Sequence, residues 1–211
     1  MSDKKESSDQ RIQIVSAVLV SLVVITIAWS AYQSTLWSGI QTFRLTESSR
    51  AGQQVTMLNL QQGQVMTTNV VTFTQYINAL MSHNQKLSNF YLERFSPEFK
   101  VAVEAWLATN PLENTTAPLH PFAMPEYNKT FAQKAEQMSK LAESKLEEAQ
   151  QANKNSDGYV LLTVIYAAVL FVGATISSFS SRRLRIGILI VGVIIFSLAT
   201  AMLLQMPVAT E

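Results

Sequence analysis

Three long intervals of this sequence contain no charged residue, and they constrain the fold more than any other feature. They cover residues 12–43, 158–181 and 186–210. A helix needs about 20 apolar residues to cross the hydrocarbon core of a bilayer, and each interval can supply them. Backbone polar groups in lipid must be satisfied within the segment, so three isolated apolar runs are expected to be helices. The sequence therefore predicts an all-α membrane protein with three transmembrane helices.

The order of these runs predicts the organisation of the chain. The first run could instead be a signal peptide cleaved near Ala28 and Ser30, but its apolar part exceeds the usual 7 to 15 residues. We therefore expect it to be retained. The predicted segments are an N-terminal tail 1–11, a first span 12–33, an outer segment 34–157, a second span 158–179, a turn 180–185, a third span 186–205 and a C-terminal tail 206–211.

Basic residues close to the spans predict the orientation. The turn between the second and third spans contains Arg182, Arg183 and Arg185, and the N-terminal tail contains Lys4, Lys5 and Arg11. Positive residues beside membrane spans usually stay in the cytoplasm. Two spans separate the tail from the turn, so both can lie inside. Residues 34–157 and the C-terminus are then expected outside.

The outer segment is predicted to be a helical hairpin. No proline occurs in 34–81, and 126–157 is rich in residues that favour helices. We expect 34–65 to pair antiparallel with 126–157 as an elongated, coiled-coil-like stalk, with 66–125 as a helical cap. Within the cap, Ser96 can cap a helix that begins at Pro97, and four prolines in 111–125 predict a loop.

Three stretches of the sequence carry a resemblance to a known group. They are "AWSAYQSTLWSGIQ", "ERFSPEFKVAVEAWLATNPLENTTAPLHPFAMPEY" and "NSDGYVLLTVIYAAVLFVGATISSFSSRRLR". Together they resemble uncharacterised bacterial inner-membrane proteins with three spans and a helical extracytoplasmic insertion, and "PFAMPEY" is the most specific part. The resemblance implies a multi-pass protein of the bacterial inner membrane. It brings no catalytic residues to this chain.

Composition and motifs exclude several classes of function. The net charge is only +1 and no long basic cluster is present, so we expect no nucleic-acid partner. The chain has no cysteine, and neither His83 nor His120 has a neighbour at metal-ligand spacing. His83 is interpreted as a polar or capping residue and His120 as part of a packed loop. We expect no metal, no cofactor and no enzymatic activity.

An aromatic stripe follows the first apolar run. Amphipathic aromatic side chains are enriched at membrane interfaces, so the stripe is interpreted as a membrane-interface anchor. A ligand groove at the membrane surface is the alternative. We expect the polar member to bond near Asn155 or Tyr159 at the start of the second span. The stripe comprises Trp29, Tyr32, Gln33 and Trp37.

The second span carries a row of small and weakly polar residues at helical spacing. Such rows favour close contact between membrane helices. A conduction path is the alternative, although the spans lack the ionisable residues that usually mark one. We interpret the row as a helix-packing stripe. It comprises Thr163, Tyr166, Leu170, Gly173 and Ser177.

These observations lead to two hypotheses about function. The first is a non-enzymatic membrane protein whose outer helical domain mediates assembly or recognition of an envelope partner. The second is a small oligomeric channel or a transport accessory subunit, with a pore lined by Ser, Thr and Gln. The expected partners are the lipid bilayer and either further copies of the chain or another envelope protein.

Overall fold

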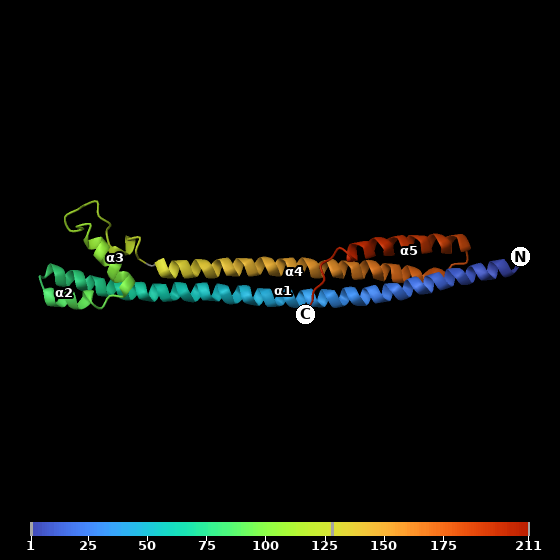
Figure 1. The fold of residues 1–211 in the computed structure, drawn as a ribbon, viewed down its shortest axis with the longest axis horizontal. Helices are drawn as coiled ribbons and strands as arrows, with labels where there is room; N and C mark the ends of the chain where they lie inside the picture. The colour runs from blue at the N-terminus through green and yellow to red at the C-terminus, as the bar shows by residue number, and fades with distance from the viewer. Residues whose placement is uncertain (1, 128, 211) are drawn as a thin grey trace. The chain divides into compact units, whose positions relative to one another are not determined.

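The computed structural model describes residues 2–127 and 129–210, with the side chains of 2–9, 129 and 177 left aside. Every regular element in this part of the chain is helical. Three of the helices are long and apolar enough to cross a membrane, which confirms the predicted all-α class. Figure 1 shows the order of the elements: α1 (Ser2–Met81), α2 (Gln85–Leu92), α3 (Pro97–Leu107), η1 (Pro121–Ala123), α4 (Lys129–Thr175), η2 (Ile176–Ser178) and α5 (Arg182–Leu203).

The chain divides into two compact units. The first unit consists of Met1–Thr46 and Lys145–Glu211, and the second unit consists of Glu47–Ser144. The helices α1 and α4 contribute to both units, because the division falls inside each of them. All of α5 belongs to the first unit, and α2, α3 and η1 belong to the second.

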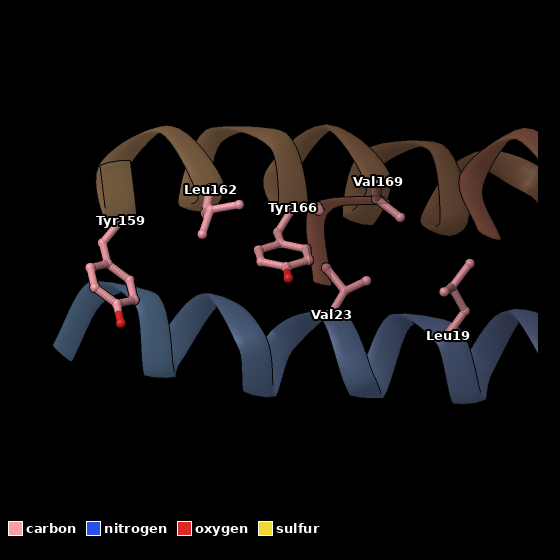
Figure 2. Packing of buried hydrophobic residues seen from close by; sticks show 7 residues of the cluster. Leu19, Val23, Tyr159, Leu162, Tyr166 and Val169 are labelled. Atoms are coloured by element: carbon pink, nitrogen blue, oxygen red, sulfur yellow. The ribbon is translucent and has the colours of Figure 1, made fainter. Parts of the chain in front are cut away.

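In the first unit α1 and α4 run antiparallel and pack through a mainly apolar core. Early residues of α1 meet late residues of α4: the hydroxyl of Ser16 donates to the carbonyl of Gly173 at 3.0 Å, and Ser34 meets Ser156 at 3.0 Å. Side chains from the two helices point toward each other in Figure 2. Helix α5 adds Ala199 and the partly buried Phe196. The buried cluster comprises Leu19, Val23, Tyr159, Leu162, Tyr166, Val169 and Ala199.

In the second unit the core is aromatic. Phe99 is fully buried, stacks on Phe122 at 5.1 Å between ring centroids, and meets Phe73 edge-on at 6.1 Å. Offset and edge-on ring pairs add to the stabilisation that burial of apolar area provides. This cluster holds α3 and η1 against the last turns of α1, because Phe73 comes from α1, Phe99 from α3 and Phe122 from η1.

Helix ends in the second unit agree with the sequence in part. Helix α1 ends at Met81, and Pro97 opens α3 as predicted. Ser96 occupies the predicted N-cap position of α3, but its side chain makes no capping bond. The side chain of Glu98 in α3 instead bonds to the start of α4. Its carboxylate accepts a hydrogen bond from the backbone N–H of Thr130 at 3.1 Å.

His83 closes α1 in the left-handed conformation, with φ of 54°. The N–H of His83 donates to the carbonyl of Leu80, and the N–H of Asn84 donates to that of Ala79 at 2.9 Å. This pair of bonds is the Schellman arrangement that ends many helices. The capping interpretation of His83 is therefore confirmed by its backbone geometry.

Candidate functional site

The four residues of the aromatic stripe do not share one environment. Trp29 and Tyr32 are 43% and 48% exposed, and their ring centroids lie 6.1 Å apart. Gln33 is buried, with only 1% of its surface exposed. The stripe therefore divides into an outward aromatic pair and an inward polar side chain. The outward pair suits an interface anchor, because aromatic side chains with one polar end favour that environment.

Gln33 binds the backbone of the C-terminal tail. Its Nε2 donates to the carbonyl of Ala209 at 3.3 Å, and its Oε1 accepts from the N–H of Ala209 at 2.8 Å. The amide thus satisfies both backbone groups of one buried residue. The expected bond near Asn155 or Tyr159 was wrong, because the tail fills the space beside Gln33.

Two further side chains donate to one carbonyl of the same tail. The indole N–H of Trp37 and the hydroxyl of Tyr159 each lie 3.1 Å from the oxygen of Pro207. Trp37 comes from α1 and Tyr159 from α4, so the tail connects both helices. We call Gln33, Trp37, Tyr159, Pro207 and Ala209 the tail site.

The chain reaches the tail site because α5 ends just before it. Backbone bonds close α5 near Leu203, and Pro207 cannot donate a helical hydrogen bond. Met206 then packs close to Gly158, where a Cβ atom would lie only 2.6 Å from Cε of Met206. Because Cε is the flexible end of Met206, this contact shows that the tail packs on α4 at Gly158 but does not require glycine there.

The predicted packing stripe on α4 faces two different neighbours. The hydroxyl of Tyr166 lies 3.2 Å from that of Thr200 on α5, and Gly173 meets Ser16 on α1. Thr163 donates to the carbonyl of Tyr159 in its own helix. The side chain of Ser177 lies outside the described part of the structure. Tyr166 and Gly173 thus make the close helix contacts expected of a packing stripe.

The three arginines that are expected to set the topology differ in their surroundings. Arg183 lines a groove of about 560 Å³ between the end of α4 and the start of α5. Arg185 lines a smaller cavity of about 250 Å³ with Ile12, Ser16 and Gly173. Arg182 is exposed at the first position of α5. The short turn therefore directs guanidinium groups toward different faces of the first unit.

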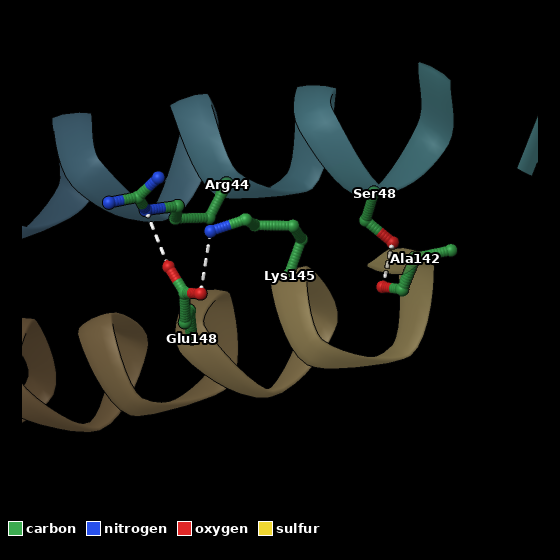
Figure 3. Close-up of polar contacts among 5 residues, drawn as sticks. All are labelled: Arg44, Ser48, Ala142, Lys145 and Glu148. Carbon is green, nitrogen blue, oxygen red and sulfur yellow. Dashed lines mark hydrogen bonds and ion pairs between the residues drawn. The ribbon is translucent and has the colours of Figure 1, made fainter. Parts of the chain in front are cut away.

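An ion-pair group joins α1 and α4 outside the predicted spans (Figure 3). Arg44 Nε lies 2.9 Å from Glu148 Oε2, and Lys145 Nζ lies 2.7 Å from Glu148 Oε1. The hydrogen bond from Lys145 lowers the pKa of the Glu148 carboxyl, and the charges of Arg44 and Lys145 add to this effect. A lowered pKa stabilises the fold above the ordinary carboxyl pKa, and the effect is lost as pH falls through the lowered value.

In the second unit a hydroxyl of α1 forms a hydrogen bond to the backbone of α4. Ser48 Oγ donates to the carbonyl of Ala142 at 2.8 Å (Figure 3). Glu136 and Lys140, four residues apart in α4, also form an ion pair, with Nζ of the lysine 2.7 Å from Oε1 of the glutamate. Both partners are largely exposed, so the pair contributes little to stability.

The proline-rich loop carries apolar side chains outward. Leu112 and Leu119 are 70% and 88% exposed. The loop around His120 was expected to be packed, and Leu119 departs from this expectation, because it faces outward while Pro121 is buried and Phe122 packs against the aromatic core of the second unit. The ring of His120 contacts Phe122 at 5.6 Å between centroids.

Metal-ligating side chains do not gather in the described residues. Among the described side chains of 10–127 and 130–210, no group of three or more His, Asp or Glu could hold a metal ion together. Comparisons with known protein families, with curated proteins and with solved structures find no match to this chain. The resemblance to three-span inner-membrane proteins therefore stays a prediction.

The sequence pointed to side chains of the tail site but not to the backbone groups that they bind. Gln33 and Trp37 stand out as polar groups at the edge of an apolar run, but Pro207 and Ala209 contribute only backbone atoms. Backbone carbonyls and N–H groups have no sequence signature. One signal was present: a buried glutamine needs both a donor and an acceptor as partners.

Proposed function

We propose that this chain is a non-enzymatic multi-pass protein of a bacterial inner membrane whose outer helical domain recognises or assembles with another envelope component. The observation that carries the proposal is the pair of exposed leucines on the proline-rich loop, Leu112 and Leu119. Binding residues are found more often than average on loops that a rigid scaffold holds in place. The first unit then serves as the membrane anchor.

The loop that presents these leucines is held in a defined conformation. The indole N–H of Trp106 donates to the carbonyl of Pro118 at 2.7 Å. Asn114 accepts bonds from the N–H and the hydroxyl of Thr116 at 3.0 and 2.7 Å. A loop fixed in this way loses little conformational entropy when a partner binds. This preorganisation supports a role in recognition.

The proposed topology follows the distribution of basic residues. The N-terminus and the 180–185 turn lie in the cytoplasm, and 34–157 lies outside as a helical hairpin that reaches from the membrane. The antiparallel contacts of α1 with α4 within each unit support this arrangement, since they place Arg44 beside Glu148 and Ser48 beside Ala142.

Hydrogen bonding favours an anchor over a channel. Several hydroxyls along the apolar helices are engaged within the protein, since Ser16 bonds to Gly173, Thr26 to Val23, and Ser197 to Val193, whereas the buried hydroxyl of Ser30 has no partner among the described residues. A pore lined by Ser and Thr would need such groups to face water and ions. The scaffold hypothesis therefore has the better support.

Site-specific photo-crosslinking in native membranes tests the proposal. A benzophenone amino acid at Leu119 or Leu112 should give the same discrete adduct, because both side chains project from one loop. The matched control places it at Thr67, which is exposed on α1 away from the loop. Leu112→Ser should reduce the Leu119 adduct several-fold. Equal labelling at all three positions, or no adduct from the loop, would contradict the proposal.

A further inference from the structure

The groove between α4 and α5 is open, apolar and lined by both helices. Its volume of about 560 Å³ lies within the usual range for sites that bind small ligands. Phe171 on one wall is 70% exposed, so the groove opens onto the surface of the first unit. Its lining comprises Phe171, Val172, Thr175, Phe179, Arg183, Leu184, Gly187, Ile188 and Val191.

One positive charge accompanies this apolar lining. Arg183 is exposed and makes no ion pair or hydrogen bond within the described part of the chain. No Asp or Glu occurs in 158–210, so the two helices that line the groove offer it no carboxylate. Arg185, two positions further on, lines the other cavity, beside α1. The groove therefore combines apolar walls with a single guanidinium whose charge is not neutralised by any residue of its own lining.

The groove lies at one end of two helices that are apolar enough to cross a membrane. Arg183 belongs to the first turn of α5, and Phe179 lies in the connection that precedes it. A lipid molecule beside these helices has its phosphate at the membrane surface and its acyl chains along the apolar segment. Guanidinium groups bind phosphate oxygens through two parallel hydrogen bonds, and basic pockets between membrane helices bind anionic head groups.

We propose that this groove binds one anionic glycerophospholipid, with its phosphate on Arg183 and an acyl chain between α4 and α5. A zwitterionic lipid carries its own cation beside the phosphate, so it gains less from the arginine. The proposal rests on the membrane placement in the proposed function but not on its outer partner. Loop crosslinking can therefore fail while lipid binding succeeds, and the reverse also holds.

Native mass spectrometry of the full chain in detergent tests the charge requirement. Dioleoylphosphatidylglycerol and dioleoylphosphatidylcholine have the same chains, so their difference reports the head group. We expect one phosphatidylglycerol per chain, retained about tenfold better than phosphatidylcholine, as one charged hydrogen bond of roughly 1.5–3 kcal/mol allows. Arg183→Gln should remove this preference, whereas Arg50→Gln, the same change on an exposed part of α1, should leave it intact.

A second variant tests the groove itself. A Cβ atom at Gly187 would meet nothing within 4 Å, so Gly187→Leu can fill the groove without displacing protein atoms. We expect it to reduce binding of both lipids while thermal unfolding without added lipid is unchanged or improved. Gly39→Leu is the control, since that glycine is equally open but belongs to α1. Equal retention of the two lipids, equal effects of the two arginine variants, or full binding by Gly187→Leu would overturn the proposal.

Discussion

At the scale of single residues, Gln33 makes the most specific polar contact of the first unit. Its amide is the partner of both backbone groups of Ala209, and both residues are buried. Gln33→Leu would leave a buried donor and a buried acceptor without partners. We expect a loss of about 1–3 kcal/mol for a group left unsatisfied, measured by thermal unfolding in detergent.

The matched control for this change is Gln53→Leu. Gln53 is exposed on the same helix, so its replacement should change the unfolding temperature little. Removal of residues 207–211 should abolish the difference between wild type and Gln33→Leu, because the glutamine then has no tail to bind. A tail deletion that leaves the effect of Gln33→Leu intact would show that its stability role lies elsewhere.

At the scale of whole elements, Gly173 sets how closely α1 and α4 approach. A Cβ atom there would lie 2.8 Å from Cγ2 of Val20, closer than real Cβ contacts occur. Ala is about 1 kcal/mol more favourable than Gly inside an isolated helix. We nevertheless expect Gly173→Ala to lower the unfolding temperature, since the contact with Val20 must open and the bond from Ser16 to Gly173 must shift.

Two further variants provide controls for this prediction. Gly39→Ala lies on α1 where a Cβ atom meets nothing within 4 Å, so it should be neutral or stabilising. Val20→Ala should destabilise the wild type, because it removes packed methyl groups, but it should restore stability to Gly173→Ala, because it removes the atom that clashes there. If the effects of Gly173→Ala and Val20→Ala on the free energy of unfolding simply add, close packing at Gly173 does not limit the approach of α1 to α4.

At the scale of the whole molecule, the prediction concerns topology. A reporter that is active only outside the cytoplasm should work when fused after Asn84 and should be silent when fused after Ser181. The arginines of the 180–185 turn supply the physical reason, because positive residues beside spans resist translocation. Activity only at Ser181 would show that the orientation is reversed. Activity at both positions would show that the helix between them does not cross the membrane.

The sequence alone determined the class of this protein and the start of one of its helices. Charge-free intervals of sufficient length leave helices as the only form that satisfies the backbone of isolated spans in lipid, and three such helices are present. The start of α3 at Pro97 followed from a local signal, because proline suits the first position of a helix. These features depend on short-range chemistry, which is written residue by residue.

Only the tertiary structure decided which groups meet. The partner of Gln33 is a backbone segment 176 residues away. Glu98 lies in the first turn of α3 but forms a hydrogen bond to the first turn of α4. Leu119 faces outward although its sequence neighbours suggested burial. Which groups meet depends on the packing of the long helices against one another and against the C-terminal tail. Partners that contribute only backbone atoms cannot be recognised from the side-chain pattern. The physical reason is that hydrogen bonds and close contacts are properties of pairs, whereas periodicity and composition are properties of one segment.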